Sequence, residues 1–151
     1  MTTAIVGIAF VAALELFAVC TKQNRAGGQM TVAMMLAQHA QEMTIGLPFT
    51  DPNPLTATFG AETGETPATY DDIDDFNGRS FSPPIDALRQ PINELSQYTQ
   101  TVTVAPVSVN QPGSAGTAGA AVRMSVTISY QPTGASPVET VYRYSWLRMN
   151  Q

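Results

Sequence analysis

Residues 1–20 read MTTAIVGIAFVAALELFAVC, and this stretch decides the fold. It is almost entirely apolar and carries one charged side chain, Glu15. A run of about 18 or more apolar residues is long enough to cross the core of a bilayer as a helix. Helix-compatible sequence continues to about Met43, so we expect an apolar stalk helix over residues 1–25 that leads into a polar globular head over residues 26–151.

Charge and composition exclude some classes of function. Seven Lys and Arg against 12 Asp and Glu give a formal net charge of −5, which argues against nucleic acid as the principal partner because phosphate binding needs cations. No Lys or Arg occurs between Ala26 and Gly78, so the middle of the chain is an acidic surface. Cys20 is the single cysteine, and an intrachain disulfide is therefore excluded. The abundance of Gly, Pro and small polar residues favours an exported, β-rich protein.

The apolar run is not typical of a removed secretory signal, because such a signal begins with basic residues and the first cation here is Lys22. Two interpretations remain. In the first, the run is a permanent single-span anchor, with Lys22 and Arg25 at the membrane edge. In the second, the helix stays in a membrane only temporarily and is later buried against copies of itself.

The second half of the helix, residues 29–45, has a different pattern. Gly27 and Gly28 precede it, and because each glycine weakens a helix by about 1 kcal/mol relative to alanine, they predict a bend or a locally melted turn. Apolar residues then recur at steps of three and four, which predicts one apolar helix face that packs on a sheet. This face comprises Ala33, Leu36, Ala37, Ala40 and Met43. His39 lies beside it without a second histidine or a nearby cysteine, so we expect a structural role.

Gly46 and Pro48 end the helix. Residues 46–95 are rich in Pro, Gly, Thr and acids, without sustained periodicity, and predict a long, ordered acidic loop. Within residues 96–150 three segments alternate between two faces, namely 101–107, 122–130 and 141–147, which predicts a small antiparallel sheet. The predicted fold class is α+β, with a long N-terminal helix packed on a small C-terminal antiparallel sheet.

This order of elements resembles the type IV pilin and pseudopilin family over the whole chain. Residues 3–16, TAIVGIAFVAALEL, are similar to the interior of the apolar pilin helix. Residues 70–78, YDDIDDFNG, are similar to an acidic loop of minor pilins and of secretion pseudopilins. The resemblance implies a pilin-like fold and a structural, non-enzymatic subunit of a type IV pilus-like or pseudopilus filament. It also implies a cell-surface or extracellular filament, with a precursor held in the inner membrane.

Family members begin with a basic leader, a processing-site glycine, an apolar residue and an early glutamate, and none of these precedes Thr3. One account is that the chain starts a few residues inside the mature helix, in which case the resemblance implies prepilin peptidase as a partner. The other is that Met1 is the mature end and the usual glutamate is absent.

The physical consequence of the stalk is assembly. Outside a membrane, such a helix would expose on the order of 1,500 Å² of apolar surface, which corresponds to tens of kcal/mol of unfavourable hydration. Copies of the chain, or of related pilins, would cover it, and small residues such as Gly7 and Ala12 allow close helix approach. Glu15 is either paired with a neighbour's Lys22, Arg25 or hydroxyl groups, or exposed where the run meets solvent. The predicted assembly interface is Ile5, Val6, Ile8, Phe10, Val11, Leu14, Glu15 and Phe17.

One acidic cluster has the composition of a cation site. Five oxygen-bearing side chains fall within seven residues: Asp71, Asp72, Asp74, Asp75 and Asn77. Calcium takes six to eight oxygen ligands on a flexible loop, and the match is partial because Ile73 and Phe76 interrupt the pattern. The alternative is a solvated acidic turn whose Asp side chains cap backbone amides, with Phe76 buried. We expect no other cofactor.

No catalytic constellation stands out, since the chain has one histidine, its cysteine lies in the apolar run and no phosphate-binding glycine loop occurs. The leading hypothesis is therefore a filament subunit. The alternative, from a different class, is a monomeric single-span membrane-anchored extracytoplasmic binding module with an acidic, calcium-binding loop.

Overall fold

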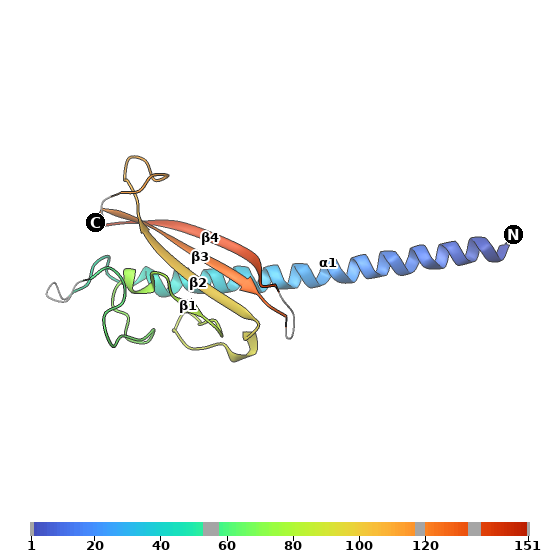
Figure 1. Ribbon diagram of the computed structural model, residues 1–151, viewed down its shortest axis with the longest axis horizontal. Helices are drawn as coiled ribbons and strands as arrows, with labels where there is room; N and C mark the ends of the chain where they lie inside the picture. The colour runs from blue at the N-terminus through green and yellow to red at the C-terminus, as the bar shows by residue number, and fades with distance from the viewer. Residues whose placement is uncertain (1, 53–57, 117–119, 133–136, 151) are drawn as a thin grey trace. The chain divides into compact units, whose positions relative to one another are not determined.

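The computed structural model describes residues 2–52, 58–116, 120–132 and 137–150, with the side chains of 2–6 and 8 excepted. One long helix, α1 (Thr2–Ile45), precedes two short 3-10 helices, η1 (Asp74–Phe76) and η2 (Asn93–Leu95). The four strands are β1 (Ser80–Phe81), β2 (Tyr98–Pro106), β3 (Ala121–Tyr130) and β4 (Glu139–Met149), as Figure 1 shows. The predicted α+β fold class, with its long N-terminal helix and antiparallel sheet, is confirmed.

The chain divides into two compact units, Met1–Val32 and Ala33–Gln151. The first unit is the first part of α1. In the part of the chain that the structure describes, no helix has both the length and the apolar character needed to cross a membrane.

The locally melted turn predicted at Gly27 and Gly28 is wrong, because α1 passes through both residues without interruption. Thr31 Oγ1 donates a hydrogen bond to Gly27 O at 3.0 Å within this stretch. If the helix ended and started again, a second nucleation step would be needed, and helix nucleation is unfavourable. Continuing the helix through the two glycines costs only about 1 kcal/mol for each glycine. A Cβ atom at either position would meet nothing within 4 Å, so no contact in the described chain requires glycine there.

The sheet of the second unit has the strand order β1-β2-β3-β4, and every neighbouring pair is antiparallel. Val102 of β2 pairs with Val126 of β3, which pairs with Tyr144 of β4. The three predicted strands are thus confirmed; β3 and β4 extend beyond their predicted bounds, whereas β2 begins earlier than predicted and ends at Pro106, one residue before the predicted end. Strand β1 has two residues, too few for alternation to predict it.

The core of the second unit lies between the end of α1 and the sheet. All five residues of the predicted helix face are buried, which confirms that prediction. The sheet contributes buried side chains that alternate along β2 and β3, namely Val102, Val104, Met124, Val126 and Ile128. The alternation predicted for β2 and β3 therefore corresponds to alternating buried side chains, whereas β4 alternates between half-buried and exposed residues.

Two polar side chains of the sheet hold the backbone of α1. Gln100 is fully buried, and its Nε2 donates to Leu36 O at 2.8 Å while its Oε1 accepts from Ile85 N at 3.2 Å. Arg148 of β4 donates to Thr44 O at 2.6 Å, to Ile45 O at 3.3 Å and to Leu47 O at 3.1 Å. The last turn of α1 has no basic residue of its own, so Arg148 supplies the cation that a helix C-terminus favours.

Candidate functional site

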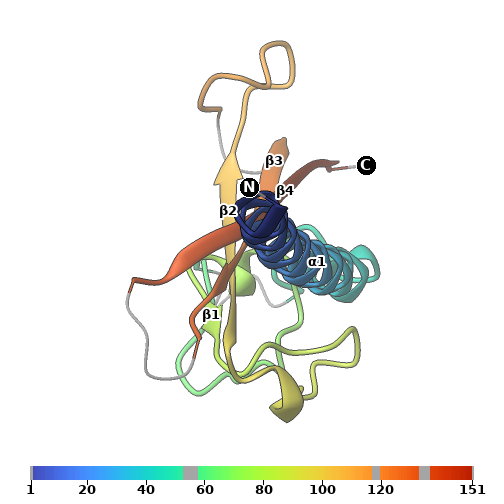
Figure 2. The same cartoon turned by 90° about the vertical axis from the view of Figure 1, so that its right-hand side faces the viewer.

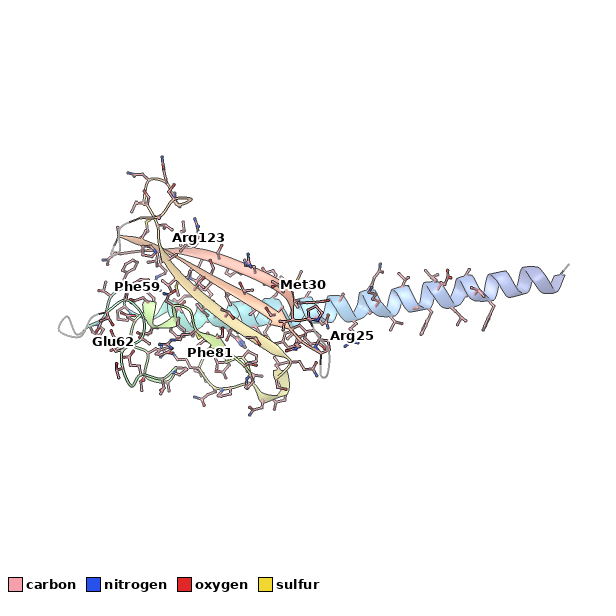
Figure 3. All side chains as sticks on the ribbon, in the orientation of Figure 1. Arg25, Met30, Phe59, Glu62, Phe81 and Arg123 are labelled. Carbon is pink, nitrogen blue, oxygen red and sulfur yellow. The ribbon has the colours of Figure 1, made fainter. Side chains whose placement is uncertain are left out.

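The first part of α1 carries a continuous apolar surface. Six large apolar side chains of the described residues 10–19 are between 52% and 73% exposed, namely Phe10, Val11, Leu14, Leu16, Phe17 and Val19. At 100° per residue these positions point in all directions around the helix axis, and Figure 3 shows the sticks projecting around the ribbon. A helix that is apolar all round is normally covered by other protein or by lipid. Ile5, Val6 and Ile8 of the predicted interface lie outside the described side chains.

Glu15 is exposed in this surface, beside a shallow hollow of about 340 Å³ that Gly7, Val11 and Ala12 also line. The four residues follow one another along α1 at spacings of four, one and three, so they share one side of the helix. The small side chains leave room for a neighbouring helix at this side. Of the two predicted alternatives for Glu15, the isolated chain shows the exposed one, while pairing would require a neighbour.

The predicted metal ligands in the acidic loop bind backbone amides. Asp72 Oδ1 accepts from Asp74 N at 2.9 Å and from Asp75 N at 3.2 Å. In turn, Asp75 Oδ2 accepts from Asp71 N at 2.9 Å and from Asp72 N at 3.2 Å. These reciprocal bonds fix the first turn of η1, as expected for carboxylates at the N-terminus of a helical turn.

The other predicted ligands point to different parts of the second unit. Asp74 Oδ2 accepts from Gly60 N at 3.0 Å, and Asn77 Oδ1 accepts from Val104 N in β2 at 3.0 Å. Phe76, between them, is fully buried, with its ring 5.0 Å from that of Tyr70. The structure therefore shows the capping arrangement given as the alternative, except that Asp72, Asp74 and Asp75 are buried rather than solvated.

A different set of carboxylates converges. Ligand oxygens of Glu62, Glu65 and Asp75 lie within 4.8 Å of one another, and among the described residues this is the one such group of three or more acidic, His or Cys side chains. Only Asp75 belongs to the predicted set. Glu62 and Glu65 line a neighbouring hollow of about 580 Å³ together with Asp51, Asp71 and Thr58. The spacing of acidic residues in the sequence does not predict this group, because a turn with left-handed Gly60 and Gly64 brings residues 62–65 back to η1.

Burial and mutual repulsion change the acidity of these groups. Burial, then the hydrogen bond and charge of Asp74, raises the pKa of Asp72 to about 8. Burial also raises the pKa of Asp75, and of Glu65, whereas the hydrogen bond from Thr58 N lowers the pKa of Glu62. Several carboxylates held together would gain from a proton or a cation.

Two arginines next to the cluster bond to the backbone. Arg89 Nη1 donates to Tyr70 O at 2.6 Å and to Pro67 O at 3.2 Å, and its guanidinium lies 5.6 Å from the centre of the Phe76 ring. Arg79 Nε donates to Asp75 O at 3.4 Å. These contacts were not predicted, because both arginines fall in a region without periodicity. They hold the acidic loop in place rather than neutralise its carboxylates.

His39 is half-buried on α1, and its Nδ1 is buried without a hydrogen-bond partner in the described part of the chain. It belongs to no group of potential metal ligands there.

Comparison of the chain with protein-family models, with curated proteins and with solved structures found no match.

Proposed function

We propose that the chain is a structural subunit of a type IV pilus-like or pseudopilus filament at the cell surface, assembled through the first part of α1. The observation that carries the proposal is the apolar surface of residues 10–19, which no other part of its own unit covers. At about 25 cal/mol per Å² of apolar surface, each large side chain left in water costs on the order of 1 kcal/mol or more. Contact among copies removes this cost repeatedly along a filament.

The small residues on one side of the helix support close contact between copies. Gly7 and Ala12 flank Glu15 in the shallow hollow, where a neighbouring helix can approach. A carboxylate in such a bundle needs a partner, because an unpaired charge in apolar surroundings is costly. Lys22 of a parallel neighbour would meet Glu15 if the two helices were staggered by seven residues, which corresponds to an axial step of about 10 Å.

The experiment uses the full chain, purified in detergent, from which the detergent is then removed. We expect regular filaments that sediment and that show a repeating axial step in electron micrographs. Val11→Asp places a carboxylate in the apolar surface and should reduce the sedimented fraction at least tenfold. Val109→Asp is the matched control, because Val109 in the second unit is 49% exposed against 55% for Val11. Equal assembly of both variants, or a wild-type chain that stays monomeric, contradicts the proposal.

The convergent carboxylates favour a second candidate, a monomeric binding module whose acidic loop takes calcium. Glu62, Glu65 and Asp75 provide three of the six to eight oxygens that calcium prefers, with water or backbone carbonyl groups completing the set. Calcium binding would raise the melting temperature, because it adds its binding free energy to the folded state. Glu65→Gln should abolish that increase, while the control Glu42→Gln keeps it. No increase in the wild type contradicts the calcium site.

A further inference from the structure

A tight turn between β1 and η2 presents the most exposed of the large apolar side chains in the described chain, Leu88, at 80% exposure. Asp86 N donates to Gln90 O, and Arg89 N donates to Asp86 O, both at 2.9 Å. Asp86 Oδ1 also accepts from Leu88 N and Gln90 N, both at 2.8 Å. Four hydrogen bonds thus fix five residues, Asp86–Gln90, which we call the Leu88 turn.

The Leu88 turn is fixed to the second unit from both sides. At its base, Ile85 is buried and forms an antiparallel bridge with Pro91, and Ile85 N donates to the buried Gln100. At its far side, the Arg89 guanidinium is held by Tyr70 O and Pro67 O. Arg89 has φ 62°, the left-handed region that is unfavourable for a residue with a side chain.

A single exposed leucine is common on protein surfaces and needs no explanation. The backbone of the Leu88 turn is less common, since a left-handed residue other than glycine is strained and persists only where its surroundings determine it. The result is an apolar side chain on a rigid support. Rigid presentation lowers the entropy that binding must overcome, so this turn is suited to contact with another surface.

A hollow of about 660 Å³ with a mixed polar and apolar lining lies elsewhere on the same unit, where α1 and β4 end. Its apolar lining includes Ile45, Leu47, Phe49, Leu147 and Met149. Ile45, Leu147 and Met149 are between 44% and 62% exposed. Arg148 fixes one wall through its bonds to Thr44 O and Leu47 O, so the hollow is also supported by rigid elements.

We infer that, in the filament, the Leu88 turn of one copy inserts into the hollow of the next copy; the inference rests on the proposed function. The charges of the two surfaces agree with this pairing. Arg148 is the one ionisable side chain that lines the hollow. The segment around the turn presents the acids Asp86 and Glu94, while the Arg89 guanidinium is turned inward towards Tyr70 O.

The positions of the two surfaces determine the kind of assembly. In Figures 1 and 2 the segment between β1 and η2 lies apart from the ends of α1 and β4. A contact between two different surfaces is heterologous, and repeated heterologous contacts generate open helical filaments rather than closed dimers. One leucine-centred contact buries far less than the 1,200 Å² or so of a stable complex, so it acts only between copies already held together by their helices.

The test cross-links filaments of the full chain in a Cys20→Ala background, using Leu88→Cys and Leu147→Cys separately and together with a short bismaleimide. Both side chains are exposed, so neither substitution alters the core. We expect a ladder of covalent oligomers from the double variant and at least tenfold less cross-linking from either single variant. Dimers from Leu88→Cys alone, or no ladder from the double variant in intact filaments, would overturn the contact. If the wild-type chain, tested in parallel, forms no filaments at all, the proposed function fails as well, and the two failures are therefore distinguishable.

Discussion

The two halves of α1 contain similar apolar residues but differ in what covers them. In the second half, Leu36 is fully buried, because the apolar side chains occur on one face and the sheet of the same unit lies against it. In the first half, Leu14 is 53% exposed, and apolar side chains point in every direction. The comparison shows that periodicity, rather than hydrophobicity alone, separates a helix segment that completes its own domain from one that needs a partner.

The largest expected effect comes from making the same change in each half. Leu36→Ala removes a fully buried side chain and leaves a cavity, so it should lower the free energy of unfolding by about 2–5 kcal/mol. Leu14→Ala should change that free energy by less than about 0.5 kcal/mol, because its side chain has no core to leave. Denaturant titration of both full-length variants measures the difference. Equal losses would show that the two halves are covered in the same way.

A smaller effect concerns the acidic loop of the second unit. The folded pKa of Asp72 is about 8, above its ordinary value of 3.8, so between these values the folded state keeps a proton that the unfolded state has lost. The contribution of Asp72 to the free energy of unfolding is therefore greatest below about pH 4, and this free energy falls as the pH rises towards 8.

Asp72→Asn stays neutral and keeps an oxygen for the Asp74 and Asp75 amides. Relative to the wild type it should gain at least about 1 kcal/mol at pH 8, since one pKa unit corresponds to about 1.4 kcal/mol. The gain should vanish near pH 4. Unfolding titrations of both proteins across this range measure it, and a difference independent of pH would contradict the assigned pKa.

The smallest effect tests how the end of α1 is held. Arg148→Met keeps an apolar stem but removes the donors to Thr44 O, Ile45 O and Leu47 O, which should cost about 1 kcal/mol. Hydrogen exchange should increase in the last turn of α1 and remain unchanged around Gly27. Equally faster hydrogen exchange along the whole of α1 would show that the helix responds as a single element. That result would contradict the difference between its two halves.

The sequence predicts those helices and strands whose hydrophobic periodicity extends over enough residues to be recognised. The buried face of residues 33–43 follows from helical spacing, and β2, β3 and β4 follow from alternation. Strand β1 could not be predicted because two residues show no period. The local preference of Gly27 and Gly28 suggested a break, but the cost of a new helix nucleus is larger.

The candidate site was harder to predict because its contacts are not local. The pattern of residues 71–77 marked the acidic turn, yet it gave no signal that Glu62 and Glu65 would join Asp75. Arg89 and Arg148 bind carbonyl groups that are 19 and 104 residues away in the sequence, at Tyr70 and Thr44. Such pairs depend on how the loop and the sheet fold together, and neither residue belongs to a motif.

If copies of the chain cover the first half of α1, as we propose, Cys20 reports this coverage, because it is exposed in the single chain. The measurement is maleimide labelling of the full-length chain in detergent and in filaments after detergent removal. Val109→Cys in a Cys20→Ala background provides an exposed comparison site in the second unit. We expect Cys20 to label at least tenfold more slowly in filaments, while labelling at position 109 is unchanged. Equal labelling of Cys20 in both states would contradict it.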